Sequence, residues 1–104
     1  ADLLRGHGGA DLYIVDHAAD VIDETGTAPG ELDLVEASLS WTLGANLERL
    51  QLVGTAADGI GNDLANRIVG NASANLLSGS GGDDTLDGGS GSDTLNGGSG
   101  ADSM

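Results

Sequence analysis

The sequence predicts an all-β chain whose short strands and turns follow a nine-residue repeat. Across residues 61–104, a glycine, an Asn or Asp, and an aliphatic residue each recur at nine-residue steps. The middle of the chain alternates apolar and polar side chains, as a half-buried strand does. A fixed period of this kind is typical of a solenoid, in which each unit packs on its neighbours.

Composition narrows the possible partners. The 104 residues carry 17 Asp and Glu against 3 Arg, a formal charge of −14. This balance excludes nucleic acid and anionic membrane surfaces as partners, because both need a basic face. Membrane insertion is not expected either, since no apolar run is long enough to span a membrane. The acidic excess points to a cation. Cysteine is absent, so the chain has neither a disulfide framework nor a thiolate zinc site.

Residues 1–23 are predicted to be partial N-terminal repeats. Asp2, Asp11 and Asp20 are nine residues apart, and each precedes an apolar residue by two positions. The unit that contains Asp20, VDHAADVID, has no glycine, so we expect its turn to differ from the others.

Residues 24–60 are predicted to be a connecting β segment. Five apolar residues alternate with polar ones over residues 35–43, which predicts one strand with a buried face. Trp41 is expected to cover the core, with carbohydrate stacking as the alternative. Leu50 and Leu52 continue an alternating pattern, and we interpret LERLQLV as a strand in preference to a helical turn.

Residues 61–104 are predicted to be nonapeptide repeats. Glycines at the start of each unit permit a tight turn, and the last three residues form a minimal strand with one side chain facing inward. The inward residues are Ile68, Leu77, Leu86, Leu95 and Met104, and the recurring polar residues are Asn66, Asn75, Asp84, Asp93 and Asp102.

The last units, GSGGDDTLD, GGSGSDTLN and GGSGADSM, resemble the G-G-x-G-x-D-x-U-x nonapeptide of the repeats-in-toxin (RTX) family, the secreted haemolysin-type calcium-binding proteins. Ser80 stands where the second glycine is usual. The resemblance implies a parallel β-roll, a right-handed β-helix-like solenoid, with a less regular β segment in the middle. It also implies that the first six residues of each unit form a turn that binds calcium.

In such a two-sided roll, units 18 residues apart stack at about 4.8 Å, the spacing between strands. Asp84 would then lie over Asp102. Two carboxylates at this distance repel by about 1 kcal/mol in water and about 3.5 kcal/mol at an effective dielectric constant of 20. Calcium suits the pair better than magnesium, because it accepts six to eight oxygen ligands in flexible geometry. We therefore rank Asp84 with Asp102 as the strongest site.

The other pairs are weaker. Asn66 over Asp84 and Asn75 over Asp93 replace a charge by an amide, which weakens calcium binding or leaves an asparagine ladder instead. Asp2 over Asp20 lacks the glycine turn, Asp11 would face Pro29, and Asp93 needs a residue 111 beyond this sequence.

The resemblance also implies that carbonyl oxygens of the turns complete each calcium shell. The alternative is that the turn glycines merely permit the turn. The glycines concerned are Gly79, Gly81, Gly82, Gly97, Gly98 and Gly100, with Gly88, Gly89 and Gly91 on the opposite side.

Five inward aliphatic residues contribute too little hydrophobic free energy to order residues 61–104 alone. We therefore expect the chain to be largely unfolded without calcium and to fold as calcium binds. The remaining acidic residues, such as Glu31, Glu36 and Glu48, are expected to be solvated.

No catalytic constellation is expected. His7 and His17 have no second motif that would complete a zinc site or a triad. The leading hypothesis is a calcium-binding segment of a larger secreted or cell-surface protein, which contacts adjoining domains or repeats of that protein. The alternatives are an accessory module of an extracellular enzyme such as an alginate epimerase, protease or lipase, with weak polysaccharide contact, and a spacer repeat of a surface adhesin.

Overall fold

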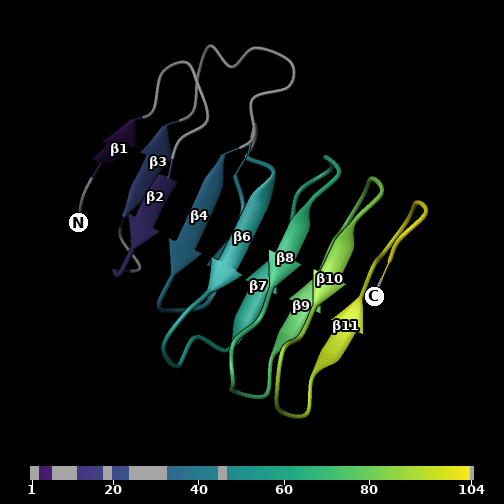
Figure 1. Cartoon of the computed structure of the whole chain (residues 1–104). Helices are drawn as coiled ribbons and strands as arrows, with labels where there is room; N and C mark the ends of the chain where they lie inside the picture. Colours follow the sequence, from purple (N-terminus) through teal and green to yellow (C-terminus); the bar gives the residue numbers. More distant parts are fainter. Residues whose placement is uncertain (1–2, 6–11, 18–19, 24–32, 45–46, 104) are drawn as a thin grey trace.

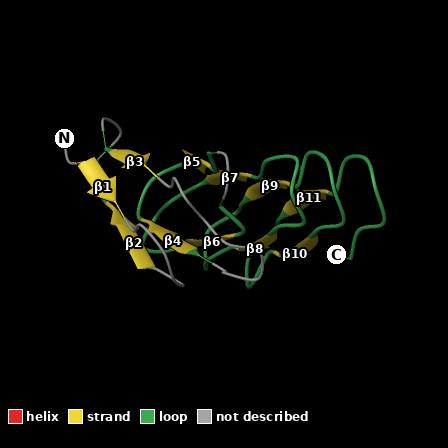
Figure 2. Cartoon of the chain, turned by 90° about the horizontal axis from the view of Figure 1, so that it is seen from above, coloured by secondary structure: helices red, strands yellow, loops and turns green. Residues whose placement is uncertain are grey.

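The chain is wound into a flattened solenoid of short parallel strands (Figure 1). The computed structural model describes residues 3–5, 12–17, 20–23, 33–44 and 47–103. Seen from above, the coils form two walls of strands joined by turns at both edges (Figure 2). The predicted all-β parallel β-roll is confirmed. The part of the chain described contains no helix long and apolar enough to span a membrane.

The strands of the described residues form three parallel sheets. One wall is a five-stranded sheet in the order β10-β8-β6-β4-β2, the other is a four-stranded sheet in the order β11-β9-β7-β5, and β1 pairs with β3. The first wall contains β2 (Leu12–Val15), β4 (Leu34–Ala37), β6 (Arg49–Leu52), β8 (Arg67–Val69) and β10 (Thr85–Asp87). The second contains β5 (Trp41–Thr42), β7 (Asp58–Ile60), β9 (Leu76–Ser78) and β11 (Thr94–Asn96); the pair is β1 (Leu3–Arg5) and β3 (Val21–Asp23).

The predicted 18-residue stacking holds throughout the C-terminal repeats. Leu86 pairs with Ile68 in the first wall, and Leu95 pairs with Leu77 in the second. The strands fall on the last three residues of each unit, as the nine-residue phase predicts. The turns at the start of each unit must therefore stack directly on those of the next coil.

The middle coils depart from this spacing. Leu12 pairs with Leu34, a step of 22 residues, and Leu34 pairs with Arg49, a step of 15. The expectation that Asp11 faces Pro29 assumed a step of 18, which the strand that begins at Leu12 contradicts. Asp11 and Pro29 themselves lie outside the described residues. The predicted irregularity of the middle segment is therefore real, and it consists of one long coil followed by one short coil.

The single strand predicted over residues 35–43 is wrong. The chain bends at Ser38 and Leu39, so β4 and β5 belong to opposite walls. The Ser38 amide donates to Val15 O at 3.1 Å, and the Asp58 amide donates to Ser40 Oγ at 3.1 Å, so both serines tie the corner to neighbouring coils. The apolar residues continue to face inward around the corner, which is why their alternation resembled one straight strand. The strand predicted around Leu50 is confirmed as β6.

The core is the space between the two walls. Val35, Leu50 and Ile68 lie in register along the first wall and are fully buried. Gly59 takes the inward position of β7, where an added methyl group would lie 3.1 Å from Leu50 and 3.3 Å from Leu77. Trp41 packs against this core, as predicted. Leu77 is fully buried and Leu95 only partly, so packing weakens toward the C-terminal coils.

Candidate metal centre

Two kinds of turn alternate with the C-terminal strands. The amide turns, residues 61–66 and 70–75, have the pattern Gly-Asn-x-x-x-Asn. The carboxylate turns, residues 79–84, 88–93 and 97–102, end in Asp. Because the strands pair at steps of 18, turns 61–66, 79–84 and 97–102 stack along one edge, and turns 70–75 and 88–93 stack along the other (Figure 2).

Asp84 is the most buried carboxylate of the C-terminal repeats, with 1% of its surface exposed. Its Oδ1 accepts a hydrogen bond from the Asn66 amide at 2.7 Å. Its Oδ2 is buried and has no hydrogen-bond partner. Burial raises the pKa of Asp84, and the nearby Asp102 carboxylate raises it further, while the bond from the Asn66 amide opposes both. A buried, unpartnered carboxylate oxygen is costly unless a cation or a proton compensates it.

Asp102 and Asp93 repeat this geometry in the neighbouring carboxylate turns. Asp102 Oδ1 accepts from the Asp84 amide at 2.8 Å, and Asp93 Oδ1 accepts from the Asn75 amide at 2.8 Å. Both side chains are partly exposed. Each carboxylate is thus fixed by one oxygen to the coil before it, so that Asp84 and Asp102 lie in adjacent turns of one stack.

The second oxygen of each carboxylate lies over the first residue of its own turn. A methyl group added at Gly79 would overlap Asp84 Oδ2, and the same holds for Gly88 with Asp93 and Gly97 with Asp102. Only glycine leaves room for the carboxylate at this position. The close approach explains why each Asp unit begins with glycine.

The carbonyl oxygens of the carboxylate turns point toward the next turn of the stack. Positive φ angles recur at the second and fourth turn positions, at Ser80, Gly82, Gly89, Gly91, Gly98 and Gly100. A methyl group at Gly98 would overlap Ser80 O, and one at Gly100 would overlap Gly82 O. Between these turns the chain therefore offers carbonyl and carboxylate oxygens, which are the donors that calcium prefers.

Side chains alone do not complete a metal shell. Among the described residues, no group of three or more His, Cys, Asp or Glu side chains is placed to hold one ion. Any ion in the carboxylate turns would therefore depend on main-chain oxygens. Gly81 lies beside a different carboxylate, since a methyl group there would be 3.1 Å from Asp63 Oδ1.

The amide turns use their side chains differently. Asn66 Oδ1 accepts from the Asn62 amide of its own turn at 2.8 Å, and Asn75 Oδ1 accepts from the Asn71 amide at 2.9 Å. The Nδ2 group of each donates to carbonyls of the preceding coil. Both side chains are buried with 3% of their surface exposed. Each of these bonds joins an asparagine side chain to main-chain groups, so they are not the side-chain-to-side-chain bonds of an asparagine ladder.

The predicted N-terminal ligands are only partly described. Asp20 is buried, and its Oδ2 accepts from the His17 amide at 3.1 Å and from the Asp16 amide at 3.3 Å. Asp20 thus accepts from the amide four residues earlier, as Asn66 does from Asn62. Residues 18 and 19 lie outside the described residues, so the expectation that this turn differs from the others stays a prediction. Asp2 and Asp11 lie outside the described residues, although Leu3 pairs with Val21 at the predicted step of 18.

Two acidic residues of the middle coils were missed. Asp33 is fully buried, and its amide donates to Glu48 Oε2 at 3.1 Å, so Glu48 is not simply solvated. Asp33 precedes the inward Val35 by two residues, as Asp84 precedes Leu86. This two-residue offset was the available signal, and the steps of 22 and 15 concealed it.

Comparison with known proteins agrees with this geometry. The family model of the RTX calcium-binding nonapeptide repeat (4 copies) matches residues 59–95 and 69–104. No curated protein and no solved structure shows a significant match to the chain. The matched residues contain all three carboxylate turns and both amide turns. Over residues 59–104 the chain is therefore similar to the RTX calcium-binding nonapeptide repeat family.

Proposed function

We propose that this chain is a non-catalytic, calcium-binding β-roll segment of a larger secreted protein and that its carboxylate turns fold as calcium binds. The leading site lies between turns 79–84 and 97–102. One observation carries the proposal: Asp84 Oδ2 is buried without a partner in a turn whose neighbours are oxygen atoms. A divalent cation at this position would compensate the carboxylate that burial leaves unpaired.

Asp84 and Asp102 would supply the charged ligands of this site, and the carbonyls of Ser80 and Gly82 would supply neutral ones. Turn glycines are needed for the approach of these oxygens, whether or not their own carbonyls are ligands. Asp93 would form a second, weaker site with the main-chain oxygens of turn 70–75, because a methyl group at Gly91 would lie 2.9 Å from Ser73 O. Calcium and magnesium carry the same charge, but calcium accepts flexible coordination by several oxygens, whereas magnesium requires a tighter octahedron.

The variant Asp84→Ala tests the proposal, and Glu36→Gln is its charge-matched control. Glu36 lies in β4, outside the carboxylate turns, so its variant removes the same charge without touching the proposed site. Calorimetry should show that Asp84→Ala loses the tightest calcium site, while Glu36→Gln keeps it. Equal calcium binding by both variants and the wild type would refute the site. A full β signal by circular dichroism in excess chelator would refute folding on calcium binding.

Export in an unfolded state and folding outside the cell are part of the same proposal. Calcium is scarce in the cytosol and abundant outside cells, so a turn that needs the ion stays open until export. The excess of acidic residues keeps the unfolded chain expanded. Fusion of the chain to a secreted reporter should give calcium-dependent protease resistance only in the external medium. Resistance inside the cell would contradict this part.

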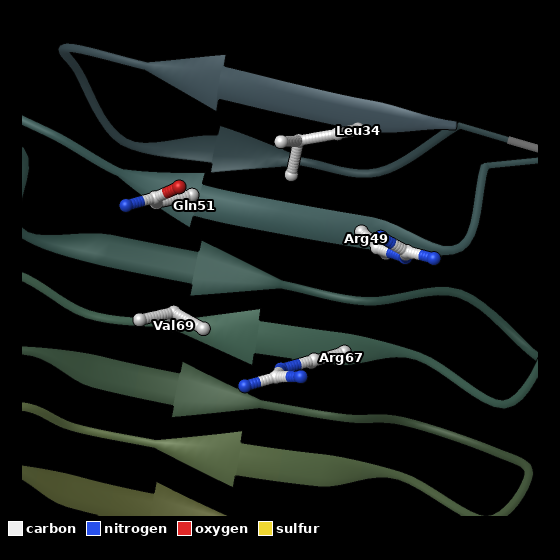
Figure 3. A pocket seen from close by; sticks show the side chains of 5 residues that line it. All are labelled: Leu34, Arg49, Gln51, Arg67 and Val69. Carbon is white, nitrogen blue, oxygen red and sulfur yellow. The ribbon is translucent and has the colours of Figure 1, made fainter. Parts of the chain in front are cut away.

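Contact with an acidic polysaccharide is a second candidate function, and one observation favours it. Two of the three arginines, Arg49 and Arg67, pair in register on the outer face of β6 and β8. Leu34, Gln51 and Val69 complete the lining of a shallow hollow there (Figure 3). Among the described residues neither guanidinium has an ion-pair partner, and like charges on neighbouring strands repel. The pair is thus available to an anionic ligand.

A polyuronate binding assay in calcium tests this second function. The double variant Arg49→Gln/Arg67→Gln should lose retention on the polymer, and the neutral polymer should not retain the wild type. In the wild-type background, Gln51→Glu would add a negative charge to the same hollow and should also weaken retention of the chain on the polyuronate. Equal retention of the wild type and the double variant would exclude the hollow as a contact.

A further inference from the structure

The amide turns carry a feature that the carboxylate turns lack: side-chain N–H groups directed at the carbonyls of the coil before. Asn62 Nδ2 donates to Gly44 O at 2.7 Å and to Leu47 O at 2.8 Å. Asn66 Nδ2 donates to Leu47 O at 3.1 Å and to Glu48 O at 3.3 Å. Two amide groups therefore occupy the interior of one turn and bind the oxygen atoms that line it.

The opposite edge repeats this arrangement. Asn71 Nδ2 donates to Ala56 O at 2.9 Å and more weakly to Gly54 O at 3.3 Å. Asn75 Nδ2 donates to Ala57 O at 2.9 Å and to Ala56 O at 3.1 Å. The recurrence on both edges shows that the pattern belongs to the Gly-Asn-x-x-x-Asn turn and not to one local contact.

An amide nitrogen donates hydrogen bonds to carbonyl oxygens, whereas a cation is coordinated by them. Each amide nitrogen has two polarised N–H bonds that can satisfy two carbonyl oxygens, and the group is neutral. The carboxylate turns have Ser or Gly at the second position and Asp at the sixth, so they lack both amide nitrogens. Ser80 Oγ donates one bond, to Gly61 O at 3.3 Å. The carboxylate turns also add charge that has to be compensated.

We propose that the side chains of Asn62, Asn66, Asn71 and Asn75 take the place of the ion, so that residues 47–78 fold without calcium and calcium-dependent folding begins at Gly79. This inference rests on the proposed calcium binding by the carboxylate turns. It limits the requirement for calcium to part of the chain, whereas the sequence alone led us to expect a requirement throughout.

Packing changes in the same direction, although gradually. Leu47, Leu50, Leu52, Ile68 and Leu77 are all less than 2% exposed and belong to the coils that the amide turns close. Beyond Gly79, the inward Leu86 is 3% exposed and Leu95 is only partly buried. The amide-closed coils thus have the more deeply buried core. Turn 70–75 carries no charged side chain, and the one carboxylate of turn 61–66, Asp63, is exposed. These coils form the surface on which the first carboxylate turn stacks.

Residue-resolved hydrogen exchange of the full chain, in chelator and in calcium, tests the inference. We expect β8 and β9 to be protected in both conditions, and β10 and β11 only in calcium. If β8 and β9 are unprotected in chelator while calcium protects all four strands, the inference fails and the proposed function stands. If β10 and β11 are protected in chelator, the proposed calcium-coupled folding fails.

Variants separate the ion-like role of the amides from ordinary packing. The double variant Asn66→Asp/Asn75→Asp should lose protection of β8 and β9 in chelator and regain it in calcium, because each new carboxylate is a calcium ligand. Asn66→Ala/Asn75→Ala should lose protection in both conditions. Asn96→Asp adds one negative charge, half that of the double variant, at an exposed site in β11 and should leave β8 and β9 unchanged. Wild-type protection of the Asp variant in chelator would overturn the inference.

Discussion

Residues 61–78 and residues 79–103 have the same nine-residue phase and the same pairing of strands, but they close their turns by different chemistry. In the first region, asparagine amides bind the carbonyls of the preceding coil, and the side chains are satisfied. In the second, the carboxylate of Asp84 retains a buried oxygen without a partner. Under the proposals above, one backbone plan accepts either a built-in donor or an external cation. The polar residues at the second and sixth turn positions would then decide which of the two closes the turn.

The largest expected effect is the loss of stability when a buried leucine is truncated in each region. Leu77→Ala and Leu86→Ala should each cost roughly 2–5 kcal/mol of local stability, since both side chains are buried. We predict that Leu77→Ala lowers stability with and without calcium, whereas Leu86→Ala lowers it only in calcium. Denaturation followed by hydrogen exchange measures both. Equal calcium dependence of the two losses would remove the distinction between the regions.

Conversion of one kind of turn into the other sharpens the comparison. Ser80→Asn/Asp84→Asn gives turn 79–84 both asparagines of an amide turn. Calcium affinity should fall by roughly 10-fold to 100-fold, about 1.4–2.8 kcal/mol, because a charged ligand is lost. The turn should also gain protection in chelator. Asp84→Asn alone supplies one of the two amides and should gain less protection in chelator. Equal protection of the single and the double variant would contradict the conversion.

A glycine that packs against the neighbouring turn should tolerate substitution less well than a glycine with open space around it. Gly100 has φ +104° and a methyl group there would overlap Gly82 O, whereas nothing lies within 4 Å of a methyl group at Gly44. We expect Gly100→Ala to cost roughly 1–2 kcal/mol in calcium from conformation alone. Gly44→Ala should be neutral or slightly stabilising. Thermal unfolding of both variants in calcium measures the difference, and equal midpoints would show that turn 97–102 is not tightly stacked.

Acidity should weaken calcium binding by the carboxylate turns, although it stabilises the calcium-free turn, and should leave the amide turns unaffected. Burial raises the pKa of Asp84 above its ordinary value of 3.8, so a proton stabilises the folded turn below the raised pKa, and this stabilisation is lost as pH rises through it. Calcium needs the ionised carboxylate, so its affinity should fall as pH falls in the same window, by at most about tenfold per unit for one proton. Calorimetry at several pH values measures the slope. Asp84→Asn should flatten the dependence of calcium affinity on pH. An equal slope in that variant would show that a group other than Asp84 takes up the proton.

The smallest effect concerns the residue that departs from the repeat pattern. Ser80 has φ +70°, where glycine is favoured, but its Oγ also donates to Gly61 O. Ser80→Gly should therefore stabilise the calcium-bound chain by no more than about 1 kcal/mol. Ser90 has no positive φ, so Ser90→Gly should have the opposite sign. Chemical denaturation in calcium compares the two, and the same sign in both would show that φ at Ser80 is not strained.

The C-terminal coils could be predicted from the sequence because their period is unbroken. The strands, the 18-residue stacking and the inward Leu77 and Leu86 follow from the phase of nine. The corner at Ser38 could not be predicted, since apolar side chains alternate around a corner as they do along a strand. Asp33 was missed because pairing with steps of 22 and 15 cannot be read from a fixed period.

The sequence could predict that Asp84 and Asp102 lie in adjacent turns, but not how their oxygen atoms are used. Spacing put Asp84 beside Asp102, yet it could not show that one Asp84 oxygen bonds to Asn66 while the other is left buried. Nor could it show that Asn62 and Asn71, at the second turn position, donate to carbonyls 15 to 18 residues earlier. These contacts depend on side-chain direction within the stacked coils, which the repeat pattern does not specify.

The most direct test of the account is a calcium titration that reports Leu77 and Leu86 separately. Methyl signals of the two leucines, assigned by Leu→Ile substitution at each position, can be followed in the full chain from excess chelator to saturating calcium. We predict that the native signal of Leu77 is present from the start and that the native signal of Leu86 appears only as calcium is added. Appearance of both signals together, at one calcium concentration, would contradict the division between amide and carboxylate turns.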